Sequence, residues 1–115
     1  MSDITERTFN FALRIIKLCQ FLNKNYAQEK SVLSKQLVRS GTSIGANVEE
    51  AQAAQSRSDF VHKMSIALKE ARETNYWLRL LKAGELMSEE KLAELIKESE
   101  EIKKIIGAIV ISSKK

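Results

Sequence analysis

The chain has 115 residues, of which 43% are hydrophobic and 30% charged, and its formal net charge is +4. This balance is typical of one folded globular domain and excludes a disordered chain. No stretch reaches the roughly 20 consecutive apolar residues that span a bilayer, and the first ten residues lack the pattern of a signal peptide. With one cysteine no internal disulfide can form, so we expect a cytoplasmic protein without a membrane partner.

Proline is absent, glycine occurs four times, and strong helix formers such as Leu, Ala, Glu and Lys are abundant. Apolar residues recur at steps of three and four in four segments separated by short polar stretches, as in helices with one buried side. We therefore predict an all-α protein, an up-and-down antiparallel four-helix bundle that forms a single domain over residues 1–115. The predicted helices are 3–26, 31–55, 58–82 and 88–111.

The first predicted helix has more apolar surface than one buried stripe needs. Its apolar residues form two neighbouring rows, Phe9, Ala12, Ile16 and Cys19 in one and Phe11, Ile15, Leu18 and Leu22 in the other. Together the rows are wider than the stripe of about 100° that an ordinary surface helix buries. One side must face the bundle core, and we expect the other side to meet a partner.

The second predicted helix holds two glycines near its centre, Gly41 and Gly45. Each costs about 1 kcal/mol relative to alanine inside a helix, so each needs a packing or functional reason. Because they are four residues apart, they share one face and would let a neighbouring backbone come close. We favour a continuous helix, and a break at Gly41 is the alternative. Ser31 or Ser34 is expected to cap its start.

Local signals indicate where the third and fourth helices begin and end. Ser56 or Ser58 can cap the third helix, and Asp59 then suits the positive helix end. Gly84 is expected to close this helix in a left-handed conformation, as the C′ residue. Ser88 is expected to cap the fourth helix.

Catalytic and metal-binding patterns are missing from the sequence. His62 is the only histidine and Cys19 the only cysteine, and neither is followed by a metal ligand at helical spacing. Gly41 to Gly45 lacks the Lys-Ser/Thr of a phosphate-binding loop. A di-metal bundle needs two Glu-x-x-His motifs, and here only Asp59 precedes the histidine at that spacing. We therefore expect no enzyme, no catalytic residue, no metal and no cofactor.

A polar stripe lies on the second predicted helix. Its members share one face at steps of four, four and three: Arg39, Ser43, Asn47 and Glu50. Asn and Ser are poor interior helix formers, so the stripe indicates a buried or interfacial hydrogen-bond network. Bonds to the third helix through Arg72 or Glu73 would explain it structurally, and a ligand or partner is the alternative.

The third predicted helix contains an aromatic and apolar run from Tyr76 to Leu81. Because Trp77, Leu80 and Leu81 cannot all share the inner face with Leu78, part of this surface points outward. Large aromatic residues beside arginine are typical of protein interfaces, and they can also stack on bases of single-stranded nucleic acid. We favour self-association, because it also explains the surplus apolar side of the first helix. The candidate oligomer-interface residues are Phe11, Phe21, Tyr76 and Trp77.

Three sequence segments, 33–51, 58–60 and 67–78, together resemble a known family. They are similar to the four-helix bundle proteins encoded in 23S ribosomal RNA intervening sequences, and the likeness covers essentially the whole chain. A more distant similarity is to the accessory variability determinant of diversity-generating retroelements. The residues that match by motif are expected to be at least as much structural as functional, and they are Gln36, Arg39, Ser43, Asn47, Glu50, Phe60 and Glu73.

The resemblance implies a bacterial protein without enzymatic activity that assembles as a homopentameric ring with a central channel. It also implies nucleic-acid binding, because the family has positive surfaces and the retroelement relative works with a reverse transcriptase. The charge of one chain is modest, but five copies would carry about +20, and phosphate contacts accumulate.

We therefore predict a non-enzymatic homo-oligomer that binds RNA, DNA or a nucleic-acid-processing protein through its basic surface. A structural or protein-partner adaptor that binds no nucleic acid is the alternative. The candidate contact residues are Arg7, Arg14, Lys17, Lys24, Lys35, Arg39, Arg57, Lys63, Arg72 and Arg79.

Overall fold

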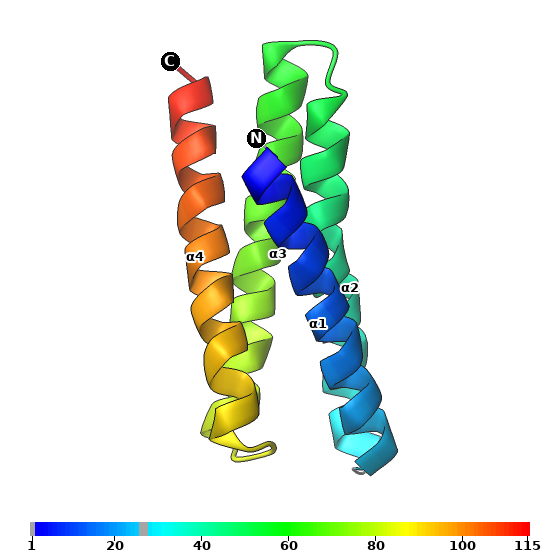
Figure 1. Cartoon of the computed structure of the whole chain (residues 1–115). Helices are drawn as coiled ribbons and strands as arrows, with labels where there is room; N and C mark the ends of the chain where they lie inside the picture. Colours follow the sequence, from blue (N-terminus) through cyan, green and yellow to red (C-terminus); the bar gives the residue numbers. More distant parts are fainter. Residues whose placement is uncertain (1, 26–27) are drawn as a thin grey trace.

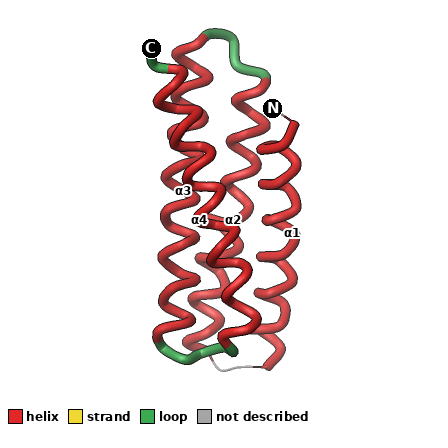
Figure 2. Tube along the Cα trace, turned by 60° about the vertical axis from the view of Figure 1, so that its left-hand side comes forward, coloured by secondary structure: helices red, strands yellow, loops and turns green. Residues whose placement is uncertain are grey.

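Four helices make up most of the chain in the computed structural model. The structure describes the backbone of residues 2–25 and 28–115 and the side chains of residues 4–24 and 32–115. The helices are α1 (Ser2–Asn25), α2 (Gln28–Gln52), α3 (Arg57–Ala83) and α4 (Glu89–Ser113). They run alternately in opposite directions (Figures 1 and 2), and no strand occurs in the described backbone. The predicted all-α four-helix bundle is confirmed, as a rod of 45 × 20 × 19 Å.

Helices that are neighbours in the sequence are also neighbours in space. Helix α2 packs on both α1 and α3, and α3 packs on α4, whereas α1 and α4 touch only sparsely. Figure 1 shows the C-terminal end of α1 well apart from the start of α4. The two helices therefore diverge toward the end of the rod that carries the α3–α4 connection, and the seam between them contains a pocket there.

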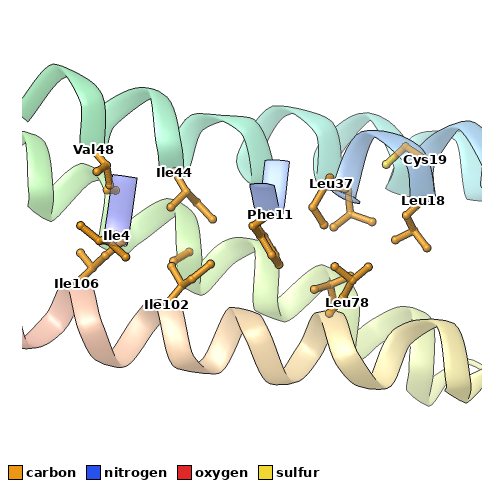
Figure 3. Packing of buried hydrophobic residues seen from close by; sticks show 14 of the residues in the cluster. Ile4, Phe11, Leu18, Cys19, Leu37, Ile44, Val48, Leu78, Ile102 and Ile106 are labelled. Atoms are coloured by element: carbon orange, nitrogen blue, oxygen red, sulfur yellow. The ribbon is translucent and has the colours of Figure 1, made fainter. Parts of the chain in front are cut away.

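The core is formed by apolar side chains from all four helices. Figure 3 shows Ile4 of α1 between Val48 of α2 and Ile106 of α4, and Phe11 pointing into the same interior. Burying each such large side chain contributes roughly 1.5–3 kcal/mol. The inward positions of α2 and α3 recur at steps of three and four, and they include the buried residues Leu37, Ser40, Ile44, Ala51, Met64, Ala67, Ala71, Leu78 and Leu81. In α4 the buried row ends at Val110, and Ile109 is half-buried.

Helix α2 is continuous through Gly41 and Gly45, and both glycines lie against α1. A Cβ atom at Gly41 would lie 2.9 Å from Cγ2 of Ile15, and one at Gly45 would lie 3.3 Å from the backbone carbonyl of Thr8. Both distances are shorter than ordinary van der Waals contacts, so a side chain at either position would push the two helices apart. The glycines thus have the predicted packing reason, the close approach of α1 to α2.

The ends of α2 each lie three residues before the predicted ones, at Gln28 and Gln52. The polar residues at 28–30 continue the helix because Gln, Glu and Lys are good helix formers. Ser31 and Ser34 therefore lie inside the helix, and the prediction that one of them caps it is wrong. Ser34 is buried, and its carbonyl oxygen accepts a hydrogen bond of 3.4 Å from Cys19 Sγ. Position 26, the predicted end of the first helix, lies outside the described residues.

Helix α3 begins after a serine cap, as predicted. Of the two candidates, Ser56 is the N-cap, because its backbone is extended and its hydroxyl accepts a hydrogen bond of 3.0 Å from the backbone N–H of Asp59. Ser88 occupies the N-cap position of α4, but its side chain makes no capping hydrogen bond. Ser88 therefore marks the start of α4 without satisfying an amide of its first turn.

The end of α3 corrects the prediction for Gly84. Gly84 has a right-handed backbone (φ −82°, ψ 0°), and the left-handed residue is Glu85 (φ 54°). The Glu85 N–H donates to the carbonyl of Lys82 and the Leu86 N–H to the carbonyl of Leu81, both at 3.0 Å. This is a Schellman motif with Glu85 at C′. The shift by one residue places Leu86 at C″, where its side chain packs against the core.

Candidate nucleic-acid interface

The basic side of α1 faces α4 across the open seam. Arg7 and Glu98 form a bidentate pair, with Nη2 2.6 Å from Oε1 and Nε 3.0 Å from Oε2. Arg14 Nη2 lies 3.4 Å from Oε1 of Glu94, and the Glu94 side chain is largely in solvent. The first pair links α1 to α4 firmly, whereas the second is an exposed pair of a kind that contributes little to stability.

Nearer the α3–α4 connection, the seam widens into a pocket of about 290 Å³. Lys91 Nζ lies 4.7 Å from the centroid of the Phe21 ring, within the range of a cation–π interaction. Among the described residues the lining holds three cations and no carboxylate. Its apolar members are Leu18, Phe21, Met87 and Leu95, and its basic members are Arg14, Lys17 and Lys91. The Phe21 pocket, as we call this site, is thus apolar inside and positive at its rim.

The adjoining stretch of the same seam has a different electrostatic character. Its described lining residues alternate in charge, and they are Arg7, Arg14, Glu94, Lys97, Glu98 and Glu101. Three carboxylates offset three cations there, so an anion gains little from that stretch. Attraction for a negatively charged ligand is concentrated at the Phe21 pocket.

The polar stripe of α2 is explained mainly by bonds within the protein. Arg39 forms ion pairs with two carboxylates of α3, Glu70 at 3.3 Å and Glu73. Ser43 Oγ donates to the Arg39 carbonyl at 2.6 Å, and Asn47 Nδ2 donates to the Ser43 carbonyl at 2.9 Å. The link to α3 is therefore carried by Arg39, because the shorter side chains bond one turn back on their own helix.

Glu73 connects this stripe to the aromatic run of α3. Its carboxylate accepts a hydrogen bond of 3.1 Å from Trp77 Nε1 in addition to the ion pair with Arg39. Arg39 Nε also donates to Gln36 Oε1 at 3.3 Å. Tyr76 is exposed and stands edge-on to the half-buried Trp77, with ring centroids 5.3 Å apart. These contacts tie α2 to α3 and leave Tyr76 as the outward aromatic side chain.

The remaining predicted contact residues are not brought together. Arg57 donates to the carbonyl of Lys115 at 2.8 Å, and Arg79 Nε donates to Asn75 Oδ1 at 2.8 Å. In the part of the chain that the structure describes, no ion pair forms at four exposed or half-buried cations, Lys24, Lys35, Lys63 and Arg72. Lys24 does not line the Phe21 pocket, but it follows Phe21 by three residues and so lies on the same face of α1.

The surplus apolar side of α1 forms a second surface, together with α2. Phe9 is 57% exposed, and Leu13 and Ile16 are also exposed. With Gly45 and its neighbours on α2 they line an apolar groove of about 290 Å³. The assignment of Phe11 to an oligomer interface is wrong, because Phe11 is 1% exposed and faces the core. The outward row begins at Phe9, two positions earlier on the helix.

A buried polar network between α3 and α4 was missed from the sequence. Asn75 is 1% exposed, and its Nδ2 donates to Ser99 Oγ at 2.8 Å and to Glu100 Oε2 at 2.9 Å. A second contact joins Ser40 of α2 to Thr74, Oγ to Oγ1, at 2.8 Å. Polar residues at inward-facing positions, such as Ser99 of α4, were the feature of the sequence that could have revealed this network. Within the described residues no buried side-chain nitrogen or oxygen lacks a partner, so these groups are structural.

The residues considered for catalysis have ordinary surroundings. His62 is exposed on α3. Cys19 is buried, and burial raises the pKa of its thiol, which keeps it protonated and unreactive. The described residues contain no group of three His, Cys, Asp or Glu side chains that could hold a metal ion. None of the helices in the described part has the length and apolar character needed to cross a bilayer.

The sequence profile of the family described as 23S rRNA-intervening sequence protein matches residues 2–108. This chain belongs to that family. A solved structure from Bacteroides thetaiotaomicron, described as a protein with unknown function from the S23 ribosomal protein family, is 45% identical with a TM-score of 0.84. The similarity covers 93% of this chain and 97% of that one. No match was found among curated proteins.

Membership of the 23S rRNA-intervening sequence protein family confirms the resemblance predicted from the motif residues. In this member, Arg39 and Glu73 form an ion pair between α2 and α3, and Gln36 accepts a hydrogen bond from Arg39. Phe60 is half-buried and packs against the core near the start of α3. Glu50 is exposed. Most of the motif therefore lies in helix packing, and the Phe21 pocket is built from residues outside it.

Proposed function

We propose that this member of the 23S rRNA-intervening sequence protein family is a non-enzymatic homo-oligomer that binds single-stranded RNA or DNA in the cytoplasm. The observation that carries the proposal is the cluster of Arg14, Lys17 and Lys91 around the Phe21 pocket, with no carboxylate among the described lining residues. Phosphates gain most where cations are concentrated and not neutralised by neighbouring carboxylates. Lys17 and Lys91 form no ion pair within the described residues, whereas Arg14 is shared with the exposed Glu94. An aromatic ring inside the cluster adds a surface for a base.

Assembly would strengthen this binding. One chain carries only +4, but each copy in an oligomer contributes its own cluster, and a polyanion that reaches several clusters gains from all of them. The surface that we propose for self-association is the α1–α2 groove with Phe9, Leu13 and Ile16. Tyr76 and Leu80 on α3 are exposed apolar residues that a second copy can supply. Five copies is the number that the family resemblance implies.

Nucleic-acid binding is tested with a fluorescein-labelled single-stranded RNA of about 12 nucleotides. We expect the anisotropy of the wild-type chain to show binding at about 20 mM salt that weakens steeply toward 200 mM, because counterions are released from the strand. Lys17→Gln and Lys91→Gln should weaken binding, whereas Lys63→Gln, which removes a charge from a distant part of α3, should not. A wild-type chain that binds no RNA or single-stranded DNA at low salt refutes the proposal.

Self-association is tested by light scattering after size exclusion. We expect the wild-type mass to correspond to five copies, and Phe9→Ser combined with Leu13→Ser to lower it. Ile111→Ser is a matched control, because Ile111 is an equally exposed apolar residue on α4, outside the groove. A monomeric wild-type chain at micromolar concentration would exclude the assembly.

A protein-partner adaptor is the second candidate function, and the apolar character of the α1–α2 groove favours it. In that case the groove would hold a different protein, and the chain would be monomeric when purified. Self-association and the binding of a different protein are separated by the molecular mass of the variant with Phe9→Ser and Leu13→Ser. These substitutions would leave the mass unchanged if the groove serves a different protein.

A further inference from the structure

We propose that the Phe21 pocket receives one unstacked base of a single-stranded nucleic acid, with the Phe21 ring as its stacking partner. The basic residues at the rim would hold the phosphates on either side of that base. This inference rests on the proposed function and deepens it, because it assigns the contact to a single pocket and excludes a duplex as the ligand.

The size and lining of the pocket fit one base. A volume of about 290 Å³ lies at the lower limit of small-molecule sites, so the pocket has room for one flat ring system and little more. Leu18, Met87 and Leu95 give it apolar walls from α1, α4 and the connection that precedes α4. Such walls suit the faces of a nucleobase, which are apolar, while its polar edge points toward the open seam.

The Phe21 ring is held for stacking by its position in the fold. It is half-buried and packs against the core, so its orientation is fixed before a ligand arrives. Lys91 lies over the ring, with Nζ 4.7 Å from the centroid. The lysine stem is flexible, so its ammonium can turn from the ring to a phosphate when a base takes its place. The resting cation–π contact thus holds the pocket positive without filling it permanently.

The charges along α1 define the path of the strand. Lys17 precedes Phe21 by four residues and Lys24 follows it by three, so the two lysines lie on either side of the ring on one helix face. They are about 10.5 Å apart along the helix axis. In the other direction Glu94, Glu98 and Glu101 offset the cations of the seam, so a phosphate gains little there. The strand would therefore run past Lys17 and Lys24 and not along the seam toward Arg7.

A base in a duplex is already paired and stacked, so it cannot enter the pocket unless it is first extruded. We therefore expect the wild-type chain to bind a single-stranded RNA of about 12 nucleotides at least 10-fold more tightly than the corresponding duplex. Equal affinity for the two would overturn the inference.

The ring is tested by Phe21→Leu, which retains an apolar side chain and removes the stacking surface. We expect it to weaken RNA binding by about 5- to 100-fold, the range that stacking on one aromatic ring contributes. Phe60→Leu is the matched control, because Phe60 is also half-buried but lies on α3 near the other end of the rod. Lys17→Gln and Lys91→Gln should each reduce the slope of log affinity against log salt by about 0.7.

Crosslinking gives a second readout that needs no substitution. An RNA that contains 5-iodouridine should crosslink to the wild-type chain within the tryptic peptide of residues 18–24, which contains Phe21. Crosslinks confined to Tyr76 or Trp77 would overturn the inference, as would a Phe21→Leu variant that binds RNA like Phe60→Leu. Those results would leave the proposed function intact, whereas a wild-type chain that binds no nucleic acid would refute both.

Discussion

The carboxylate of Glu73 accepts a hydrogen bond from the indole nitrogen of Trp77, one turn further along α3, at 3.1 Å. The same carboxylate is ion-paired with Arg39 of α2, and its side chain is 27% exposed. One residue therefore fixes the orientation of an aromatic ring and joins two helices.

Glu73→Ala is expected to lower the free energy of unfolding by about 1–2 kcal/mol. Loss of the half-exposed ion pair contributes little to this decrease. Most of the decrease comes from leaving the partly buried indole N–H of Trp77 without a partner. Because Trp77 is the only tryptophan of the chain, its fluorescence reports the change directly, and we expect a red shift. Glu70→Ala removes the other carboxylate bound to Arg39 and should leave the emission unchanged.

Gly45→Ala is expected to destabilise the bundle by about 1–3 kcal/mol, because the new methyl group would press on the backbone of α1 at Thr8. Gly41→Ala should act similarly through the fully buried Ile15. Gly107 on α4 is the matched control, because nothing lies within 4 Å of a Cβ built there. Gly107→Ala should therefore stabilise the protein by about 1 kcal/mol through helix propensity alone. Chemical unfolding measures all three, and stabilisation by Gly45→Ala would contradict the close approach.

Glu85→Gly is expected to stabilise the protein by roughly 1 kcal/mol, because a residue with a side chain is strained in the left-handed conformation that Glu85 adopts. Glu85→Ala removes the carboxylate but keeps Cβ, so it separates the effect of charge from that of the backbone. We expect it to leave the urea midpoint nearly unchanged. Equal stabilisation by both variants would attribute the effect to charge.

Glu100 should contribute to the acid sensitivity of the fold. The hydrogen bond from Lys103 is the main cause that holds the pKa of Glu100 below its usual value, and Asn75 and Arg79 act in the same direction. A pKa that is lower in the folded state gives stability that is present above the ordinary glutamate pKa of about 4.3. That stability is lost as the pH falls through the folded-state pKa. The urea midpoint should therefore fall less between pH 6 and pH 3 in Glu100→Gln than in the wild type.

A matched variant tests whether this effect belongs to the α3–α4 contact. Glu6 is an exposed glutamate on α1. Glu6→Gln should show the same acid dependence as the wild type. If Glu100→Gln also does, the interactions of Glu100 with Lys103 and Asn75 do not contribute to the acid dependence of the fold.

The helices and their inward rows could be predicted because burial imposes a spacing of three and four on the sequence itself. The packing of Gly41 and Gly45 was also predictable, since two glycines inside a helix require a reason. Helix ends were harder to place, because the polar residues at 28–30 suit a helix as well as a loop. The left-handed residue was misplaced by one because the packing of Leu86, and not the glycine, sets the register of the turn.

The Phe21 pocket was beyond sequence reasoning for a different reason. Phe21 was predicted at an oligomer interface, and Lys17 and Arg14 as nucleic-acid contacts. Their relation to Met87, Lys91 and Leu95 depends on the course of α1 relative to α4. The two glycines predict that a neighbouring helix comes close to α2, but not how α1 is then directed relative to α4. For the same reason, Arg7 could not be recognised as the internal partner of Glu98.

The sparse contact between α1 and α4 also bears on how the chain folds. Nearly all helix–helix contacts join elements that follow one another in the sequence, so few long loops have to close before the bundle gains stability. Chains of such low contact order fold in microseconds to milliseconds. With no proline in the sequence, slow prolyl isomerisation is absent as well. A slower phase in stopped-flow refolding that depends on protein concentration would therefore report the proposed association of copies.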